Sequence, residues 1–176
     1  MVAVAKDGEH RFSKTMVCEI RIIQGLGVEG DAHQGVTVKH RSRVRVDPTQ
    51  PNLRQVHLIH TELFSELSQQ GFDVKPADLG ENITTKGIDI LALPRGTLLK
   101  IGSDVELKVT GLRNPCIQID EFQKGLLRAV LIKGKNGELT RKSGIMAVVL
   151  NGGVVKEGDV IAVKYPPQPH FSLERV

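Results

Sequence analysis

Segments in which apolar and polar residues alternate recur along the chain, and each predicts a short β-strand. In residues 105–110 the side chains of Val105, Leu107 and Val109 would share one face, with polar residues on the other. Residues 16–23 alternate in the same way. Further segments with strand-like patterns are bounded by Gly, Asn or Asp: residues 54–59, 97–102, 145–150 and 158–165.

Short strands separated by glycine turns favour a closed or nearly closed barrel, because closure removes exposed strand edges. The chain contains 18 glycines and 8 prolines, which fits many turns and short elements. Its 176 residues suit one domain that buries its own core. We therefore expect residues 1–176 to form a single, mainly β domain, a barrel with a few helices packed on it.

Two segments have the spacing of amphipathic helices. Residues 62–70 carry an apolar stripe, with Thr61 as the expected N-cap and Gly71 as the expected end of the helix. Asp120 and Gln123 resemble a capping box that opens a second helix over residues 121–130. The side chains expected to face the core are Leu63, Phe64 and Leu67 in the first helix, and Phe122, Leu126, Leu127 and Val130 in the second.

Composition places the chain among ordinary soluble proteins, with 40% apolar and 25% charged residues. No apolar run approaches the roughly 18 to 20 residues that cross a bilayer, and the N-terminus has no apolar stretch typical of a signal peptide. Two cysteines do not make a secreted disulfide framework. We therefore expect a reducing compartment, the cytoplasm, and no membrane partner.

The chain is mildly basic, with a formal net charge of +4 and a pI near 9.2. This balance fits an anionic ligand without requiring nucleic acid. One Tyr and five Phe leave little material for the aromatic platforms on which single-stranded nucleic acids stack. Binding of RNA or another polyanion is therefore the least favoured of the functions considered below.

Cys116, in the stretch GLRNPCIQID, is the first candidate for chemistry. Pro115 restricts the backbone, so that the sulfur would lie on a rigid bend just after the strand predicted over residues 105–110. A nearby Arg113 would favour the thiolate, which is the form that attacks substrates or binds metals. The alternative is a small buried apolar side chain, the commonest role of a free cysteine.

Three other side chains are expected to be structural. Cys18 shares a predicted strand face with Met16 and Ile20, which assigns it to the core. His57 and His60 would point to opposite sides of a strand, so that a shared tetrahedral metal site is awkward.

The glycine-rich stretch GLGVEGDAHQG, residues 25–35, contains Asp31 and His33. Its spacing fits neither a dinucleotide-binding fingerprint nor a phosphate-binding P-loop. Asp31 and His33 have side chains that bind metals, but two ligands are too few to indicate zinc. A plain glycine turn capped by Asp31 is an equal alternative.

A run of basic residues follows in VKHRSRVRV, residues 38–46, and on a strand Arg41, Arg43 and Arg45 would share one anion-binding face. A solvated strand or loop is the ordinary alternative for such a run, which also contains Lys39 and His40. A second basic pair, Arg141 and Lys142, precedes a predicted strand.

The stretch from residue 71 to 96 has little periodicity, and long irregular segments in compact domains are usually functional or disordered. Its apolar residues argue against disorder. Within it, the loop GENITT offers Glu81, Asn82 and two hydroxyl groups. These groups could orient a polar ring by hydrogen bonds, or hold the loop to itself.

Taken in order, these motifs resemble the MOSC domain, the family named for the C-terminal domain of molybdenum cofactor sulfurases. The resemblance covers about residues 25–165 and rests on GVEGDAHQG, RQVHLI, ADLGENITTKGIDILALPRGTLLKIG, VTGLRNPCIQID, RKSGIMAVV and GDVI. Each motif alone is weak, whereas their order and spacing together are specific. The chain resembles a stand-alone bacterial-type member of the family.

This resemblance implies a barrel-like fold that binds a molybdopterin-type cofactor, the molybdenum cofactor. The cysteine after proline, here Cys116, is then the residue that contacts molybdenum or carries sulfur, and a soft thiolate suits such a metal. The residues carried over to the cofactor pocket are Asp31, His33, Arg54, Glu81, Asn82, Arg113 and Asn114. Lys14, Arg43 and Arg141 join them only because they are basic and close to motifs.

Two activities follow from the resemblance. In the first, the protein is a molybdenum-dependent oxidoreductase that reduces N-hydroxylated small molecules and takes its electrons from a separate donor. In the second, it is a carrier of the cofactor or of a persulfide on Cys116. The chain is too short to include a pyridoxal-phosphate-dependent desulfurase, so a separate protein would donate that sulfur.

Overall fold

The computed structural model describes the backbone of residues 1–176 and all side chains except those of residues 41 and 42. The strands are β1 (Ala3–Lys6), β2 (Thr15–Val17), β3 (Glu19–Ile23), β4 (Gly27–Val28), β5 (Val56–His60), β6 (Ile83–Thr85), β7 (Leu98–Ile101), β8 (Val105–Leu112), β9 (Leu131–Lys133), β10 (Leu139–Arg141), β11 (Ile145–Asn151), β12 (Gly153–Lys156) and β13 (Ile161–Lys164). The helices are α1 (Arg41–Val44), α2 (Thr61–Gln69), α3 (Gln118–Phe122) and α4 (Leu126–Val130), with a 3₁₀ turn at Ile90–Ala92.

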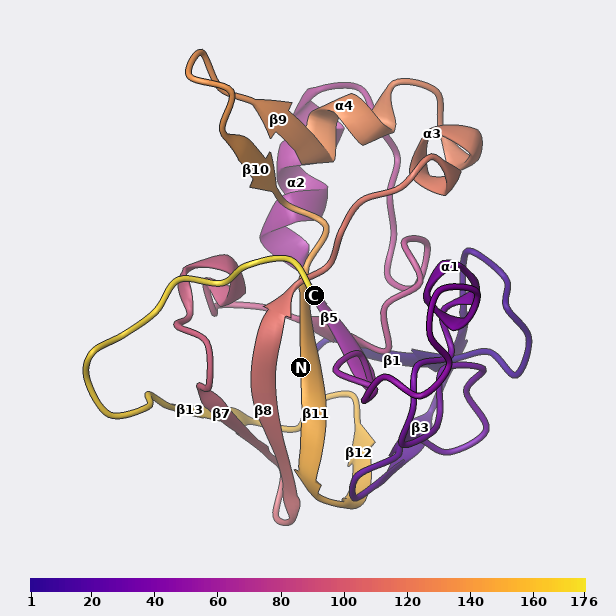
Figure 1. Cartoon of the computed structure of the whole chain (residues 1–176), viewed down its shortest axis with the longest axis vertical. Coiled ribbons are helices and arrows are strands. Elements are labelled where there is room, and N and C mark those ends of the chain that lie inside the picture. Colours follow the sequence, from indigo (N-terminus) through magenta and orange to yellow (C-terminus); the bar gives the residue numbers. More distant parts are fainter.

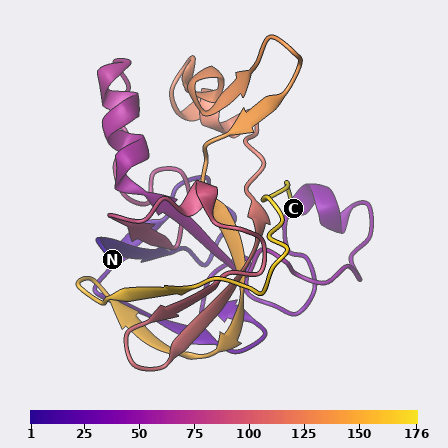
Figure 2. The ribbon, with the colours of Figure 1, turned by 90° about the vertical axis from the view of Figure 1, so that its left-hand side faces the viewer.

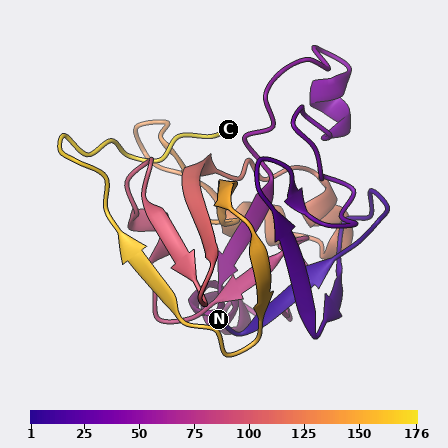
Figure 3. The ribbon, with the colours of Figure 1, turned by 90° about the horizontal axis from the view of Figure 1, so that it is seen from below.

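The main sheet has eight strands in the order β13-β7-β8-β11-β5-β6-β1-β2 and curls into a half-barrel (Figure 1). A three-stranded sheet, β12-β3-β4, packs against it around one shared core (Figure 3). The mainly β, barrel-like fold with packed helices is thus confirmed, although the main sheet remains open between its edge strands β13 and β2.

The bend between β11 and β12 explains how the two sheets are joined. Gly152 separates these strands, and a Cβ atom at this position would lie 2.6 Å from the carbonyl oxygen of Ile22. The missing side chain lets the backbone approach β3 closely. After this bend, β12 leaves the main sheet and pairs with β3, with Val155 opposite Ile20.

Helices α2, α3 and α4 form a lobe with the β9–β10 hairpin at one end of the half-barrel (Figures 1 and 2). The lobe has its own apolar core, to which α2 contributes Leu63 and Leu67, and α4 contributes Leu126 and Val130. The functional site described below lies where this lobe meets the half-barrel.

The strand predicted over residues 16–23 is interrupted, and Cys18 does not lie in the core. Residues on its two sides belong to different sheets, because β2 pairs with β1 and β3 pairs with β12. The alternation holds only within β3, where Ile20 and Ile22 are buried. Met16 lies on the edge strand with 59% of its surface exposed, and Cys18 is exposed at the break.

The end of α2 follows the sequence prediction, whereas its beginning does not. Gly71 has a left-handed backbone with φ of +87°, and the amide of Phe72 donates to the carbonyl of Leu67 at 3.0 Å. Thr61 is already the first helical residue, so His60 occupies the N-cap position and no side chain caps the helix.

The helix predicted over residues 121–130 is two short helices, α3 and α4. Asp120 lies inside α3, and its Oδ1 accepts hydrogen bonds from the amides of Gly125 at 3.0 Å and Leu127 at 3.2 Å. It therefore caps α4 instead of opening one long helix. Leu126 and Val130 are buried as expected, Leu127 is half-buried, and Phe122 is exposed.

The basic run forms the short helix α1 and not a strand. The carbonyl of His40 accepts from the amides of Arg43 at 2.9 Å and Val44 at 3.1 Å, which closes a helical turn. A shared strand face for the arginines is therefore wrong; Arg43 is half-buried and Arg45 exposed, while the side chain of Arg41 lies outside the described residues. None of the described helices is long and apolar enough to span a membrane.

Candidate functional site

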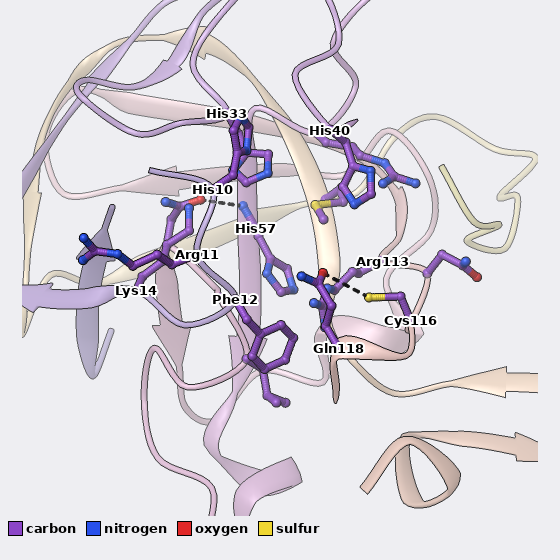
Figure 4. Close-up of a pocket in the computed structure, with 16 residues that line it drawn as sticks. His10, Arg11, Phe12, Lys14, His33, His40, His57, Arg113, Cys116 and Gln118 are labelled. Atoms are coloured by element: carbon purple, nitrogen blue, oxygen red, sulfur yellow. Dashed lines mark hydrogen bonds between the residues drawn. The ribbon is translucent and has the colours of Figure 1, made fainter. Parts of the chain in front are cut away.

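A pocket opens between the half-barrel and the helical lobe, and residues from distant parts of the chain line it (Figure 4). Strand register positions its floor: Met146 on β11 lies opposite His57 on β5 and opposite Gly111 on β8. The lining residues are His10, Arg11, Phe12, Lys14, His33, His40, Arg54, His57, Leu79, Gly80, Asn82, Arg113, Asn114, Cys116, Gln118 and Met146.

Cys116 lies at the rim of this pocket, four residues after the end of β8. It is half-buried, follows the buried Pro115, and its Sγ lies 3.6 Å from Oε1 of Gln118. In Figure 4 a dashed line joins the thiol to Gln118, and Arg113 lies close by and interacts electrostatically with Cys116. The sulfur is therefore neither sealed in the core nor remote from charged groups.

Two guanidinium groups bring positive charge into the pocket. Among the described side chains, neither Arg54 nor Arg113 makes an ion pair with a carboxylate, and the Nε of Arg54 and the Nη1 of Arg113 are buried without a hydrogen-bond partner. Burial, together with the positive charges of Arg43 and Arg113, lowers the pKa of Arg54 to about 10.

Arg113 is positioned by contacts other than ion pairs. The backbone amide of Arg113 donates to the carbonyl of Gly144 at 3.0 Å, and the Arg113 guanidinium lies 5.8 Å from the ring centre of Phe12. Burial lowers its pKa, while the nearby thiol of Cys116 and carboxyl of Glu81 act in the opposite direction. Arg113 thus adds a desolvated cation beside the sulfur.

Asp31 lies behind the pocket wall as the centre of a buried polar network. Its Oδ2 accepts from Nζ of Lys14 and, at 2.9 Å, from Nδ2 of Asn82, while its Oδ1 accepts from the backbone amide of His33 at 2.9 Å. Nδ1 of the His33 ring lies 3.2 Å from the same Oδ1. Burial alone would raise the pKa of Asp31, but the His33 and Lys14 contacts outweigh it and lower the pKa.

Burial keeps two of the pocket histidines, His57 and His40, neutral. His57 is buried on β5, and its Nε2 donates to the carbonyl of Ser143 at 2.8 Å; burial lowers its pKa well below the usual range. Burial also lowers the pKa of His40 to about 4, with the positive charges of Arg54 and Arg113 acting in the same direction.

Glu81 is fully buried behind the pocket wall and does not line the pocket. Its Oε1 accepts from the amide of Ala77 at 2.7 Å and from the hydroxyl of Thr84 at 3.1 Å, while Oε2 has no partner. Burial raises the pKa of this carboxyl group. Asn82, the next residue, does reach the pocket, and its Oδ1 accepts from the amide of His57 at 3.2 Å.

The structure brings together most of the residues predicted for the site. Lys14, His33, Arg54, Asn82, Arg113, Asn114 and Cys116 all line the pocket. Asp31 and Glu81 are buried behind its wall, and Arg141 contacts the pocket only through Asn114, whose Oδ1 accepts from its Nε at 3.2 Å. Arg43 affects the pocket through its charge on Arg54 and His40 without lining it.

Sequence reasoning missed the segment that contains His10, Arg11 and Phe12. This segment has no periodic pattern or motif, and it reaches the pocket through long-range contacts. The hydroxyl of Ser13 donates to the carbonyl of Asp78 at 2.7 Å, and the amide of Lys14 donates to the carbonyl of Ala77 at 3.0 Å. The only local signal was the basic character of Lys14.

These features define a class of protein: a β half-barrel whose edge, under a helical lobe, holds one accessible thiol in a cationic pocket. Comparison with family models gives the same class. The model of the MOSC domain matches residues 31–162, which is most of the chain. The chain belongs to the MOSC domain family.

Several solved structures have a similar fold. The YuaD protein of Bacillus subtilis is 26% identical, with a TM-score of 0.74 over 95% of this chain and 98% of that one. YiiM of Escherichia coli is 18% identical, with a TM-score of 0.64; the match covers 96% of this chain and 71% of that one. YiiM of Geobacillus stearothermophilus is also 18% identical, with a TM-score of 0.66; the match covers 97% of this chain and 76% of that one. No curated protein sequence matches the chain significantly.

Proposed function

We propose that the pocket binds the molybdenum cofactor through Cys116 and that the protein reduces N-hydroxylated small molecules. One observation carries this proposal: an accessible thiol shares a pocket with two arginines, each of which has a buried nitrogen without a partner and makes no ion pair with a described carboxylate. MOSC domains are in general associated with this cofactor, which combines a metal with anionic groups.

The unpartnered polar atoms of the pocket fit an anionic ligand. A buried donor without a partner is unfavourable by about 1 to 3 kcal/mol, and more when the donor is charged. Arg54 and Arg113 both present such donors. A phosphate or other oxyanion would satisfy them, because guanidinium groups pair with phosphate oxygens in a forked geometry.

Cys116 fits the metal end of the same group. Among the described side chains, no group of three or more His, Cys, Asp or Glu could hold a metal ion, so the chain offers no complete set of its own ligands. A single soft thiolate suits a metal that arrives already coordinated by an organic cofactor. When bound, the molybdenum centre would supply two-electron chemistry that removes an oxygen atom from a substrate.

Apolar side chains complete the pocket. Phe12, Leu79 and Met146 line it beside the charged residues, and they would contact the organic part of a substrate. Electrons would come from a separate donor protein. The substrate class expected from this combination is a small N-hydroxylated base or amine whose N–O group points toward Cys116.

An activity assay tests the reductase proposal. Protein made in a host that produces the cofactor should convert an N-hydroxylated base to the parent base when a chemically reduced dye supplies electrons. Cys116→Ser should abolish this conversion while circular dichroism shows an unchanged fold. Full activity in the serine variant would contradict the proposal.

The accessibility of the thiol favours a carrier as the second candidate. Cys116 is half-buried, and its neighbours Ile117 and Gln118 are exposed, so a partner protein could reach the sulfur from outside. Mass spectrometry after incubation with a cysteine desulfurase distinguishes this role. A mass gain of one sulfur atom on Cys116 supports a persulfide carrier, and its absence counts against sulfur transfer.

A further inference from the structure

We propose that His33 is the proton donor of this reaction and that Asp31 is the positioning residue that holds its ring. The inference rests on the proposed reductase function and assigns its acid. It is carried by the hydrogen-bond geometry of the two residues, together with the position of His33 on the pocket lining.

Asp31 is fixed from several directions, so its carboxylate offers a defined orientation to the imidazole. Only 2% of its side chain is exposed. Lys14 and Asn82 hold Oδ2, and the amide of Asp7 lies 3.4 Å from the same atom. This leaves Oδ1 for His33, whose backbone amide and ring Nδ1 both approach it.

The carboxylate of Asp31 determines which nitrogen of the His33 ring can exchange a proton in the pocket. An anionic acceptor at 3.2 Å keeps a proton on Nδ1 of His33, so Nε2 is the nitrogen available for proton exchange. About 30% of the His33 side chain is exposed, which allows solvent to return a proton after each turnover. Figure 4 shows His33 at the pocket wall beside His10 and across from His40.

Charged groups from several segments surround His33. Asp31 is negative, while Arg11, Lys14, Arg54 and Arg113 are positive and line the same pocket. Two more imidazoles are close: the ring of His10 meets His33 edge to face at 5.1 Å, and the ring of His40 lies 6.5 Å away. Burial keeps His40 and His57 neutral near pH 7, whereas the ring of His33 contacts the carboxylate of Asp31.

The reaction requires protons as well as electrons. Cleavage of the N–O bond of an N-hydroxylamine takes two electrons, which a separate flavin or iron–sulfur protein supplies, and two protons. One proton goes to the departing oxygen, which leaves as water, and one goes to the nitrogen, which becomes the amine. The Nε2–H of protonated His33 provides the proton for the oxygen, and solvent at the pocket mouth provides the other.

Kinetics of cofactor-loaded variants test this role. We expect His33→Gln to retain the molybdenum content of the wild type and to lose roughly a hundredfold in kcat. In the wild type kcat should depend on pH, and His33→Gln should lose the part of this dependence that comes from the ring. The matched control is His170→Gln, an exposed histidine in the C-terminal tail, which should behave as the wild type.

A second measurement does not depend on activity. ¹⁵N spectra of the cofactor-free wild type should show that the neutral form of the His33 ring carries its proton on Nδ1. A proton mainly on Nε2 would overturn the proposed arrangement. Wild-type kcat and pH dependence in His33→Gln would also overturn it, as would loss of molybdenum from that variant, which would assign His33 to cofactor binding.

These outcomes separate the two proposals. A wild type that binds no molybdenum and reduces nothing would contradict the proposed function, and with it a proton donor for that reaction, whatever the ring spectrum shows. An active wild type with an equally active His33→Gln variant would contradict only the role of His33.

Discussion

Arg54 and Arg113 are partly desolvated cations that form no ion pair with any carboxylate among the described side chains. A group in this condition makes the empty protein less stable than an apolar residue of similar volume would, unless a ligand compensates. The arginines that bind the cofactor in our account therefore lower the stability of the cofactor-free protein. Replacing one of them should affect stability and cofactor binding differently, which can be tested.

Arg113→Met should leave the unfolding free energy of the cofactor-free protein within about 1 kcal/mol of the wild type, or raise it, because the buried charge is removed. The same change should reduce retained molybdenum roughly tenfold or more, since a charged hydrogen-bond donor to the anion is lost. Urea denaturation and metal analysis measure the two effects. Strong destabilisation with normal molybdenum content would contradict this account of Arg113.

His57 predicts how stability depends on pH. Its pKa is lowered in the folded state, so below about pH 6.5 the unfolded chain takes up a proton that the folded protein does not. Stability from this residue is thus present above pH 6.5 and is lost as pH falls, by about 1.4 kcal/mol per pH unit. Half-buried His40 adds a smaller contribution of the same sign, down to its pKa of about 4.

Denaturation curves from pH 7.5 to 5.5 measure this dependence. His57→Gln should flatten the slope, while His170→Gln, a substitution in the exposed tail, should leave it as in the wild type. An unchanged slope in the His57 variant would show that other groups cause the acid sensitivity.

At the scale of elements, the pocket depends on the close packing of β5, β8 and the start of β11. Gly144, just before β11, has φ of +91°, and a Cβ atom there would lie 2.2 Å from the carbonyl oxygen of Leu58. Its own carbonyl accepts from the amide of Arg113. This junction therefore positions His57, Arg113 and Met146 at the same time.

Gly144→Ala should destabilise the protein by about 3 kcal/mol or more, because a left-handed backbone and a clash with β5 act together. Gly137→Ala is the matched control: Gly137 also has a positive φ of +80°, but nothing lies within 4 Å of its Cβ position. That control should cost about 1 to 2 kcal/mol, the backbone contribution alone. Equal losses in both variants would contradict the close packing of this junction.

The same elements show what local sequence could and could not predict. Alternation predicted β8, in which every second residue is buried, and a short apolar run predicted β11. It failed around Cys18, where neighbouring residues enter different sheets, and in the basic run, where a helical turn closed on His40. Short-range patterns do not encode which sheet a strand joins, so these errors arose at junctions between elements.

At the scale of the whole molecule, the order of motifs predicted the barrel-like fold, and most of the motifs contribute a residue to one pocket. Cys116, Arg54 and Asn82 were accessible to this reasoning because their motifs are compact. His10, Arg11 and Phe12 were not, because only tertiary contacts with the loop at residues 77–78 bring them there.

The central claim is that one thiol in a cationic pocket retains the molybdenum cofactor. The most direct test is the molybdenum content of wild type and Cys116→Ser, both purified from a cofactor-producing host, with Cys18→Ser as the control for the exposed cysteine outside the pocket. We predict stoichiometric molybdenum in the wild type and the control, and roughly tenfold less or lower in Cys116→Ser. No molybdenum in the wild type, or equal amounts in all three proteins, would contradict the account.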